Sequence, residues 1–338
     1  MAGSPPPSVV VIGSYNQDLT WRCESFPVPG ETIFGRFVTG PGGKGSNQAV
    51  AAARAGAATR FIGAVGNDVF GAQAAAFHRT EGIDSHFIVK ARHPTGTAGI
   101  LVNRPGQNEI VVAPGANAAI RPADVPERLI RGARVVVCQN ETTLEMNARA
   151  FALARAVGAL TVLNPAPMRA DFDRRLLATT DVLIPNETEF SALTRLLPAC
   201  RIIARAGSPV AHNPAARQPA AEEWMQKLPD PVLHALARAM GPATVIVTLG
   251  ERGCLVSQAD GYFCVPAFKG IRVVDTTGAG DAFVGGFAAG LVRFDGDMRR
   301  AAHFANAVAA LSVTKAGTAP SMPSAPAIAR FLKRHPAI

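Results

Sequence analysis

A nine-residue string at 275–283 (DTTGAGDAF) places a carboxylate where a glycine-rich turn leads into an apolar, alanine-rich segment. The pattern predicts a helix that starts near Asp281. The first turn of a helix offers unpaired backbone N–H groups and the positive end of the helix dipole, which can hold phosphoryl oxygens during transfer. A carboxylate at the same point can accept the proton of an incoming hydroxyl. The string therefore predicts phosphoryl transfer with Asp281 as general base, although a lone G-x-G-D would fit an ordinary helix cap equally well. The predicted anion hole consists of the backbone amides of Gly278, Ala279, Gly280 and Asp281.

Two other phosphate-binding patterns are missing from the sequence. No G-x-x-x-x-G-K-[ST] loop occurs in the chain, and the G-x-G-x-x-G fingerprint is absent from the turn at 275–283. The turn therefore disfavours both a P-loop NTPase and a dinucleotide-dependent dehydrogenase.

A second glycine-rich string, GPGGKGSNQA at 40–49, also leads into a helix-like segment. Bare glycines allow a ligand to approach the backbone closely. Lys44 and Asn47 supply hydrogen-bond donors for hydroxyl oxygens. Two glycines alone would indicate a flexible turn with a solvated lysine, but the adjoining Asn47 and Gln48 favour a binding site.

The hydrophobic pattern predicts a scaffold of alternating strands and helices for these strings. Apolar runs typical of buried strands occupy residues 9–13, 60–66, 135–138, 160–163, 182–184 and 244–250. Helix-like segments occupy residues 45–57, 70–81, 144–157, 224–240, 280–293 and 298–315. Because such alternation is typical of parallel strands joined by helical crossovers, we expect an α/β fold with a doubly wound, mostly parallel sheet.

Three stretches depart from this alternation. Residues 97–112 contain two β-rich runs around the turn-forming residues 104–107, which is a hairpin signature. Residues 19–39 are also β-leaning, so the two stretches could pair into a small separate sheet. Residues 201–221 predict a surface insertion.

The composition indicates what kind of molecule the protein binds and in which cellular compartment it works. The chain has 338 residues and a formal charge of +9, but its 34 basic residues are scattered and only 6% of residues are aromatic. This pattern favours anionic small substrates over nucleic acid. The five cysteines form no C-x-x-C pair, which suits reduced thiols in the cytoplasm. With no basic leader before the first apolar run and no 18-residue apolar stretch, we expect a cytoplasmic protein without a signal peptide or membrane span.

At its two glycine-rich motifs, GGKGSNQA and DTTGAGD, the chain resembles the ribokinase (PfkB-type) sugar-kinase family. The resemblance runs from about Val9 to Pro323. Further matches lie at 13–18, 164–167, 185–189 and 248–253. It implies an α/β domain spanning residues 1–338, with a small β lid built from about 18–41 and 95–117.

The resemblance also implies roles for individual residues. The sugar pocket would be formed by Asn16, Asp18, Gly42, Gly43, Lys44, Asn47 and Glu141, with Asp281 as the base. The ATP site would include Asn186, Thr248, Leu249, Gly250, Glu251, Arg252, Gly253, Gly280 and Asn306. Mg²⁺ would be organised by Asn186 and Glu189, mostly through water. An activating K⁺ would be held by Asp275, Thr277, Ser312, Lys315, Gly317 and Ser321.

The activity implied by the resemblance is ATP-dependent phosphorylation of a small sugar, with D-ribose as the first choice. Another acceptor, such as 2-deoxyribose or a nucleoside, is the alternative within the same class. A catalytically silent sugar- or nucleotide-binding protein is the alternative from a different class, and the intact Asp281, Lys44 and Asn47 disfavour it. The family also implies a homodimer formed through paired lids.

Overall fold

The computed structural model describes residues 8–200, 225 and 227–335. The predicted insertion at 201–221 lies outside these residues. Within the described part of the chain, no helix is long and apolar enough to cross a membrane.

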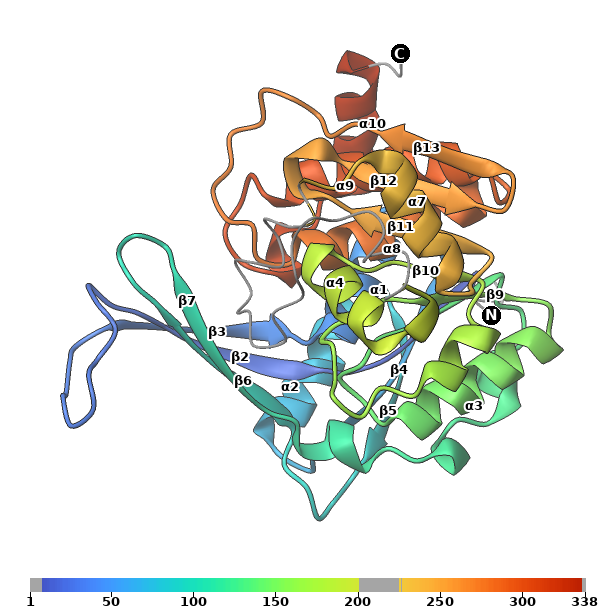
Figure 1. Ribbon diagram of the computed structural model, residues 1–338. Helices are drawn as coiled ribbons and strands as arrows, with labels where there is room; N and C mark the ends of the chain where they lie inside the picture. The colour runs from blue at the N-terminus through green and yellow to red at the C-terminus, as the bar shows by residue number, and fades with distance from the viewer. Residues whose placement is uncertain (1–7, 201–224, 226, 336–338) are drawn as a thin grey trace.

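The centre of the fold is a nine-stranded sheet in the order β13-β12-β11-β10-β9-β8-β1-β4-β5 (Figure 1). The seven strands from β11 to β5 are parallel, which confirms the doubly wound, mostly parallel prediction. The strands are β1 (Val9–Ile12), β4 (Thr59–Val65), β5 (Asp84–Val89), β8 (Val135–Cys138), β9 (Leu160–Leu163), β10 (Val182–Leu183), β11 (Thr244–Thr248), β12 (Cys254–Gln258) and β13 (Gly261–Val265).

The sheet ends in two antiparallel strands, β12 and β13, that the sequence pattern did not indicate. The strand predicted to run to Gly250 stops at Thr248, and Gly250–Arg252 form a short 3-10 turn. Gly253 then reverses the chain at φ +89°, and a Cβ there would lie 2.1 Å from the Val265 carbonyl oxygen. Only glycine fits this reversal, so the antiparallel edge depends on it.

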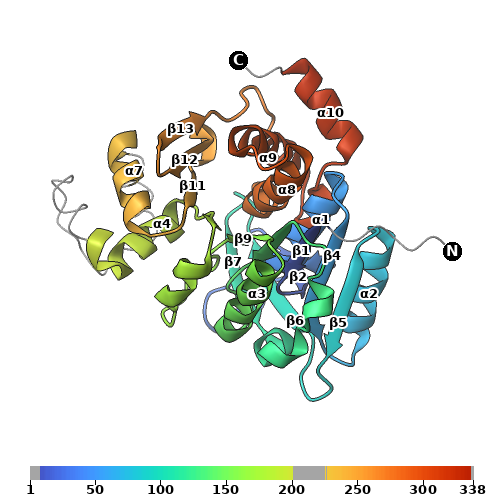
Figure 2. The same cartoon turned by 90° about the vertical axis from the view of Figure 1, so that its right-hand side faces the viewer.

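Helices cover both faces of the sheet (Figure 2). Val9 and Val11 of β1 pack into one buried cluster with α1, α8 and α9, whereas Val10 and Ile12 pack into another with α3, α4 and α7. The helices are α1 (Lys44–Arg54), α2 (Val69–Thr80), α3 (Leu144–Ala156), α4 (Glu187–Leu196), α7 (Asp230–Ala239), α8 (Ala279–Arg293), α9 (Met298–Ser312) and α10 (Ala325–Arg334).

Three predicted helix boundaries were wrong by three residues or more. The helix expected over 45–57 is α1, which ends at Arg54. The helix expected over 224–240 is α7, which begins only at Asp230 because Pro229 is extended and ends any helical run before it. The helix expected to run to 315 ends at Ser312 and gives way to a loop. That loop reaches the candidate site described below.

A second, four-stranded sheet stands off the main body in the order β3-β2-β6-β7 (Figure 1). Its strands are β2 (Asn16–Arg22), β3 (Arg36–Gly42), β6 (Gly96–Val102) and β7 (Asn108–Ala113). The hairpin predicted within 97–112 is confirmed by the antiparallel pairing of β6 with β7, and β2 joins β6 in parallel. We call this sheet the lid. Its base, where Asn16 pairs with Gly42 and Gly96, adjoins the main sheet.

Candidate active site

A cavity of about 160 Å³ lies at the carboxyl ends of the parallel strands. In doubly wound α/β folds this edge of the sheet is the usual ligand site. The cavity is bordered by the first turns of α1, α4 and α8 and by loops after β9, β10 and β11. Its lining residues are Lys44, Asn164, Ala166, Ile184, Asn186, Glu189, Thr248, Gly278, Gly280, Asp281 and Val284.

Asp281 lies in the first turn of α8, buried to 6% exposure, and lines the cavity. Gly278 is the N-cap, in the left-handed region at φ +80°, so Asp281 is the third helical residue and not the cap. Its carboxylate accepts hydrogen bonds from Asn47 Nδ2 at 3.0 Å and from Gln48 Nε2 at 2.9 Å. The alternative of an ordinary helix cap is therefore wrong, because Asp281 bonds across to α1.

The turn before Asp281 leaves room for a ligand beside the helix N-terminus. A Cβ built on Gly280 would meet no atom within 4 Å. One of the four amides predicted for the anion hole is already engaged, since Ala279 N donates to Thr276 O at 3.1 Å. The first-turn amides of Gly280 and Asp281 lie where an α-helix has no intrahelical partner for them.

Lys44 begins α1 and carries a positive charge into a group of carboxylates. Burial alone would lower the pKa of its ammonium, but the carboxylates of Asp281, Glu141 and Glu189 outweigh burial and raise that pKa. Lys44 is therefore charged at neutral pH, next to the cavity that it lines.

Glu141 fixes the start of α1 to the turn after β1. Its Oε2 atom accepts hydrogen bonds from Ser14 Oγ at 2.5 Å, from the Lys44 backbone amide at 2.9 Å and from Asn16 Nδ2 at 3.5 Å. Asn16 Oδ1 in turn accepts from Asn117 Nδ2 at 2.9 Å. The structure thus brings together three predicted sugar-site residues. It adds Ser14, which lies in the matched string 13–18 but was given no role, and Asn117, which no motif indicated.

Asp18 lies at the base of the lid, facing the loop that follows α9. Burial raises the pKa of its carboxyl to about 7, the nearby Glu141 and Asp281 carboxylates add to the rise, and a hydrogen bond from Thr318 opposes it. Gly42 makes room for this carboxylate, because a Cβ there would lie 2.2 Å from Asp18 Oδ1. Gly43 caps α1 at φ +88°, and a Cβ there would lie 2.6 Å from Asn16 N.

Asn186 and Glu189 form a reciprocal capping box at the start of α4. Asn186 Oδ1 accepts from Glu189 N at 2.8 Å, and Glu189 Oε2 accepts from Asn186 N at 2.9 Å. Burial raises the pKa of the Glu189 carboxyl, and this effect exceeds the lowering caused by Asn186 and Lys44. Both residues line the cavity, so a structural cap also presents oxygen ligands to it.

The residues predicted to bind ATP are only partly gathered at the cavity. Thr248 lines it, whereas Leu249 is buried in the core. Arg252 turns away, with Nη2 donating to Asp230 Oδ1 at 2.6 Å. Asn306 on α9 donates to the carbonyls of the loop after β13, at 3.0 and 3.1 Å.

The residues predicted to hold K⁺ lie on two loops that are bonded to each other. Asp275 accepts from the backbone amides of Thr277 and Gly317, each at 2.9 Å. These hydrogen bonds outweigh burial and lower the pKa of the Asp275 carboxyl. The Ser312 and Ser321 hydroxyls bond locally, to the Ala309 and Thr318 carbonyls respectively. Lys315 is exposed, and only its backbone amide bonds to this region, at Ser312 O.

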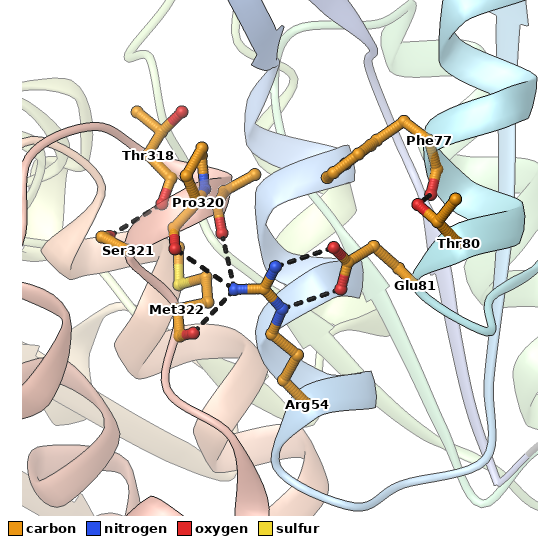
Figure 3. A network of polar contacts seen from close by, with 9 residues as sticks. Arg54, Phe77, Thr80, Glu81, Thr318, Pro320, Ser321 and Met322 are labelled. Carbon is orange, nitrogen blue, oxygen red and sulfur yellow. Dashed lines mark hydrogen bonds and ion pairs between the residues drawn. The ribbon is translucent and has the colours of Figure 1, made fainter.

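Arg54, at the C-terminal end of α1, bonds to the loop at 318–322 (Figure 3). Its Nη1 atom donates to the carbonyls of Ala319, Pro320 and Met322 at 3.3, 3.3 and 2.8 Å. Its Nε and Nη2 atoms form a bidentate pair with Glu81 at 2.7 Å each. The network fixes the loop that carries Thr318.

Thr318 connects that loop to the site. Its hydroxyl donates to Asp18 Oδ2 at 3.4 Å, and its Cα would lie 3.2 Å from a Cβ added to Gly278. The loop therefore contacts both the base of the lid and the glycine turn before α8.

A buried carboxylate beside a glycine-lined helix N-terminus, a charged lysine and a β lid fit the phosphotransferase that the motifs predicted, and the match to a family of carbohydrate kinases shows that class, a phosphotransferase acting on a sugar hydroxyl. The family model of the pfkB family carbohydrate kinases matches residues 6–325, and the chain belongs to this family. The resemblance drawn from the two motifs is thereby confirmed.

Individual relatives are similar over nearly the whole chain. A ribokinase from Mus musculus is 35% identical over 322 residues, which cover 94% of this chain and 92% of the relative. A deoxyribokinase from Salmonella typhi is 34% identical over 320 residues, covering 94% and 95%. The structure of Arabidopsis thaliana ribokinase complexed with ribose and ATP matches with a TM-score of 0.79 and 29% identity, covering 97% of this chain and 99% of that one.

Proposed function

We propose that this sugar kinase phosphorylates the terminal hydroxyl of D-ribose, using ATP and Asp281 as the general base. The observation that supports this proposal is the Asp281 carboxylate, which lines the cavity with each oxygen held by an amide donor. The similarity to the mouse and Arabidopsis ribokinases favours ribose as the substrate among small sugars. The similarly related deoxyribokinase makes 2-deoxyribose the second candidate.

In the proposed reaction, Asp281 takes the proton of the acceptor hydroxyl as its oxygen attacks the γ-phosphorus of ATP. The bond between the γ-phosphorus and the bridging oxygen breaks, and ADP leaves. The amides of Gly280 and Asp281 face the charge on the transferred group, and the Lys44 ammonium supplies a second positive centre. Asn47 Oδ1, which is buried without a partner among the described residues, would accept from a sugar hydroxyl.

The acid groups of the pocket would orient the sugar. Glu141 bonds the Lys44 amide at the α1 N-terminus and Asp18 lies beside Gly42, and both carboxylates are good acceptors for hydrogen bonds from hydroxyl groups. Closing the lid over the sugar would exclude water and so suppress ATP hydrolysis.

Two cations fit the residues present. The buried Glu189 carboxylate and the Asn186 oxygen are ligands of the hard type that Mg²⁺ takes, mostly through water. When bound, Mg²⁺ would neutralise charge on the ATP phosphates. Asp275, Thr277 and Gly317, which already form one bonded unit, would hold K⁺ together with Ser312, Lys315 and Ser321.

We also propose that the kinase is a homodimer formed through the lid. The lid carries exposed hydrophobic side chains on β2, β3 and β7, distributed over both faces because successive strand residues alternate. So much exposed apolar surface on a monomer is unusual. The residues concerned are Trp21, Phe37, Val38, Ile110, Val111 and Val112.

The test is ADP release from Mg·ATP across pentoses, hexoses and nucleosides, with and without K⁺. Ribose should give the highest kcat/KM, and Asp281→Asn should lower kcat by about 10²–10⁴-fold while ATP still binds. A higher kcat/KM for 2-deoxyribose would reassign the substrate. Equal turnover by the wild type and Asp281→Asn would remove Asp281 from the reaction, and no turnover with any acceptor would favour the silent binding protein.

A further inference from the structure

Gln48 is fully buried next to Asp281 and does not line the cavity. Its Nε2 atom donates to Asp281 Oδ1 at 2.9 Å and to Asn164 Oδ1 at 3.0 Å. Its Oε1 atom accepts from Gln139 Nε2 at 2.6 Å. The side chain thus uses both ends of its amide, and one of its contacts is a carboxylate oxygen of the proposed base.

The neighbours of Gln48 fix which end of its amide faces Asp281. Asn164 Nδ2 donates to the Ile184 carbonyl at 2.9 Å, so the oxygen of Asn164 is the end that faces Gln48. Gln139 approaches from the other side with a donor. A flipped Gln48 amide would set its oxygen against two acceptors and its nitrogen against a donor. The orientation that donates to Asp281 is the one that suits Asp281 Oδ1, Asn164 Oδ1 and Gln139 Nε2, while Gln139 Oε1 has no partner among the described residues.

Two glycines permit this close arrangement. Gly285 lies one helical turn after Asp281, and a Cβ there would lie 2.3 Å from the Gln48 carbonyl oxygen and 2.6 Å from Ala51 Cβ. Helices α1 and α8 therefore touch backbone to backbone at this point. Gly13 makes room for the Gln139 side chain, because a Cβ on Gly13 would lie 2.0 Å from Gln139 Oε1.

We propose that Gln48 is a positioning residue that holds the Asp281 carboxylate aimed at the acceptor hydroxyl, with Gln139 holding Gln48 in turn. Hydrogen bonds to a carboxylate favour its ionised form, and only that form can accept a proton. Asn47 supports the Oδ2 atom of Asp281, whereas Gln48 supports its Oδ1 atom. Gln48 acts through Asp281 and touches no reacting atom.

This inference rests on the proposed role of Asp281 and is tested by pH profiles of kcat and kcat/KM. Gln48→Met keeps the volume and removes the donor. We expect the acidic limb of both profiles to move up by about one pH unit, because losing a charge-assisted hydrogen bond is worth roughly a tenfold change in ionisation. The KM for ATP should change less than about threefold, since Gln48 does not line the cavity.

Other charges around Asp281 stay in place in this variant. They are Lys44 on α1, Glu189 on α4, Asp18 on β2 and Glu141 after β8. Any pH dependence that these groups cause is present in both the wild type and Gln48→Met. Only the difference between the two pH profiles therefore measures the effect of Gln48.

The matched control is Thr161→Val in β9. Thr161 is as fully buried as Gln48, and its Oγ1 atom lies 2.7 Å from Thr179 O and 2.8 Å from Asp181 Oδ2, the two acceptors open to its single hydroxyl proton, at the opposite end of the same sheet. It should lower stability and leave the pH profiles unchanged. Where Gln48→Met folds poorly, Gln139→Leu removes the group that orients Gln48 without changing Gln48 itself. It should shift the acidic limb in the same direction by a smaller amount.

Two outcomes would overturn the inference. One is an acidic limb in Gln48→Met and Gln139→Leu that coincides with that of the wild type. The other is a further loss of turnover when Gln48→Met is added to Asp281→Asn, because a residue that acts through Asp281 has no effect once that carboxylate is gone. Failure of the proposed function would instead appear as full activity in Asp281→Asn alone.

Discussion

Replacing Arg54 by methionine tests whether the loop at 318–322 matters for turnover. The arginine uses three nitrogens, two on Glu81 and one on three backbone carbonyls (Figure 3). Its side chain is 26% exposed and that of Glu81 is 14% exposed, so the pair is largely withdrawn from water. Methionine keeps most of the aliphatic volume and removes every donor.

The expected loss follows from these contacts. Breaking a buried ion pair from one side costs ~3–5 kcal/mol, because the remaining charge is left unpaired. The partial exposure of Arg54 lets water replace some of the lost hydrogen bonds, so we expect a loss of about 2–3 kcal/mol in the free energy of unfolding. For a chain of this length that corresponds to a fall in Tm of about 3–4 °C.

Turnover should fall as well, because the freed loop carries Thr318. This residue touches both Asp18 and the Gly278 turn, and small displacements of positioning groups can cost up to ~10²-fold in rate. We expect a drop of about tenfold in kcat/KM for the sugar. Urea unfolding and steady-state kinetics measure the two effects separately.

Arg60→Met is the control. Arg60 is 19% exposed and also bonds a carboxylate and a carbonyl, those of Asp84 and Leu129. Asp84 is 60% exposed, so water can solvate it, and the loss of stability should stay within about 1 kcal/mol with unchanged kinetics. Equal stability and equal kcat/KM in the Arg54 and Arg60 variants would refute the reasoning.

Two further predictions concern glycines and pH. Gly280→Ala should fold normally but raise the KM for ATP, because its Cβ would enter open space beside the helix N-terminus. Gly285→Ala should lower the urea midpoint, because its Cβ would meet the backbone of α1. The reverse pattern would contradict both assignments. The KM for the sugar should fall as pH rises through about 7, the raised pKa of Asp18, since the ionised carboxylate is the better acceptor. Because the unfolded chain releases this proton near its ordinary pKa, Asp18 should make folding less favourable as pH rises from about 4 to 7. Asp18→Asn should flatten both dependences, and unchanged slopes would exclude Asp18 as their source.

The parallel part of the fold was predictable because burial on both faces leaves a clear sequence signature. Val9–Ile12 and Val135–Cys138 are continuous apolar runs, and both are central strands. The edge strand β13 was missed because it is only half-buried, so its pattern is weak. Its neighbour β12 is buried, but its apolar run is only three residues long before Ser257 and Gln258. The reversal before them depends on a single glycine whose conformation the sequence does not reveal.

The candidate site was predictable where a motif held the residue and unpredictable where a contact crossed the chain. Asp281 and Lys44 stand in distinctive glycine-rich strings, so their local geometry followed from helix physics. Gln139 stands at the end of a strand, two residues before the predicted Glu141, but no pattern gave it a role of its own, and Gln48 was noted only as part of a string. Their contacts link residues 91 and 233 positions apart, and only the packing of α1 against α8 and β8 brings them together.

The same reasoning explains why Arg252 and Asn306 matched a motif and yet bond outside the cavity. A local string fixes backbone conformation, but the direction of a long side chain depends on the nearest partner in space. Asp230, on the neighbouring α7, supplies that partner for Arg252 at 2.6 Å. The carbonyls of Val265 and Pro266 supply the partners for Asn306, so this amide holds the loop after β13. Side chains that are short and placed at helix N-termini, such as Asp281 and Asn47, have fewer such alternatives, and for them a motif is a better guide to geometry.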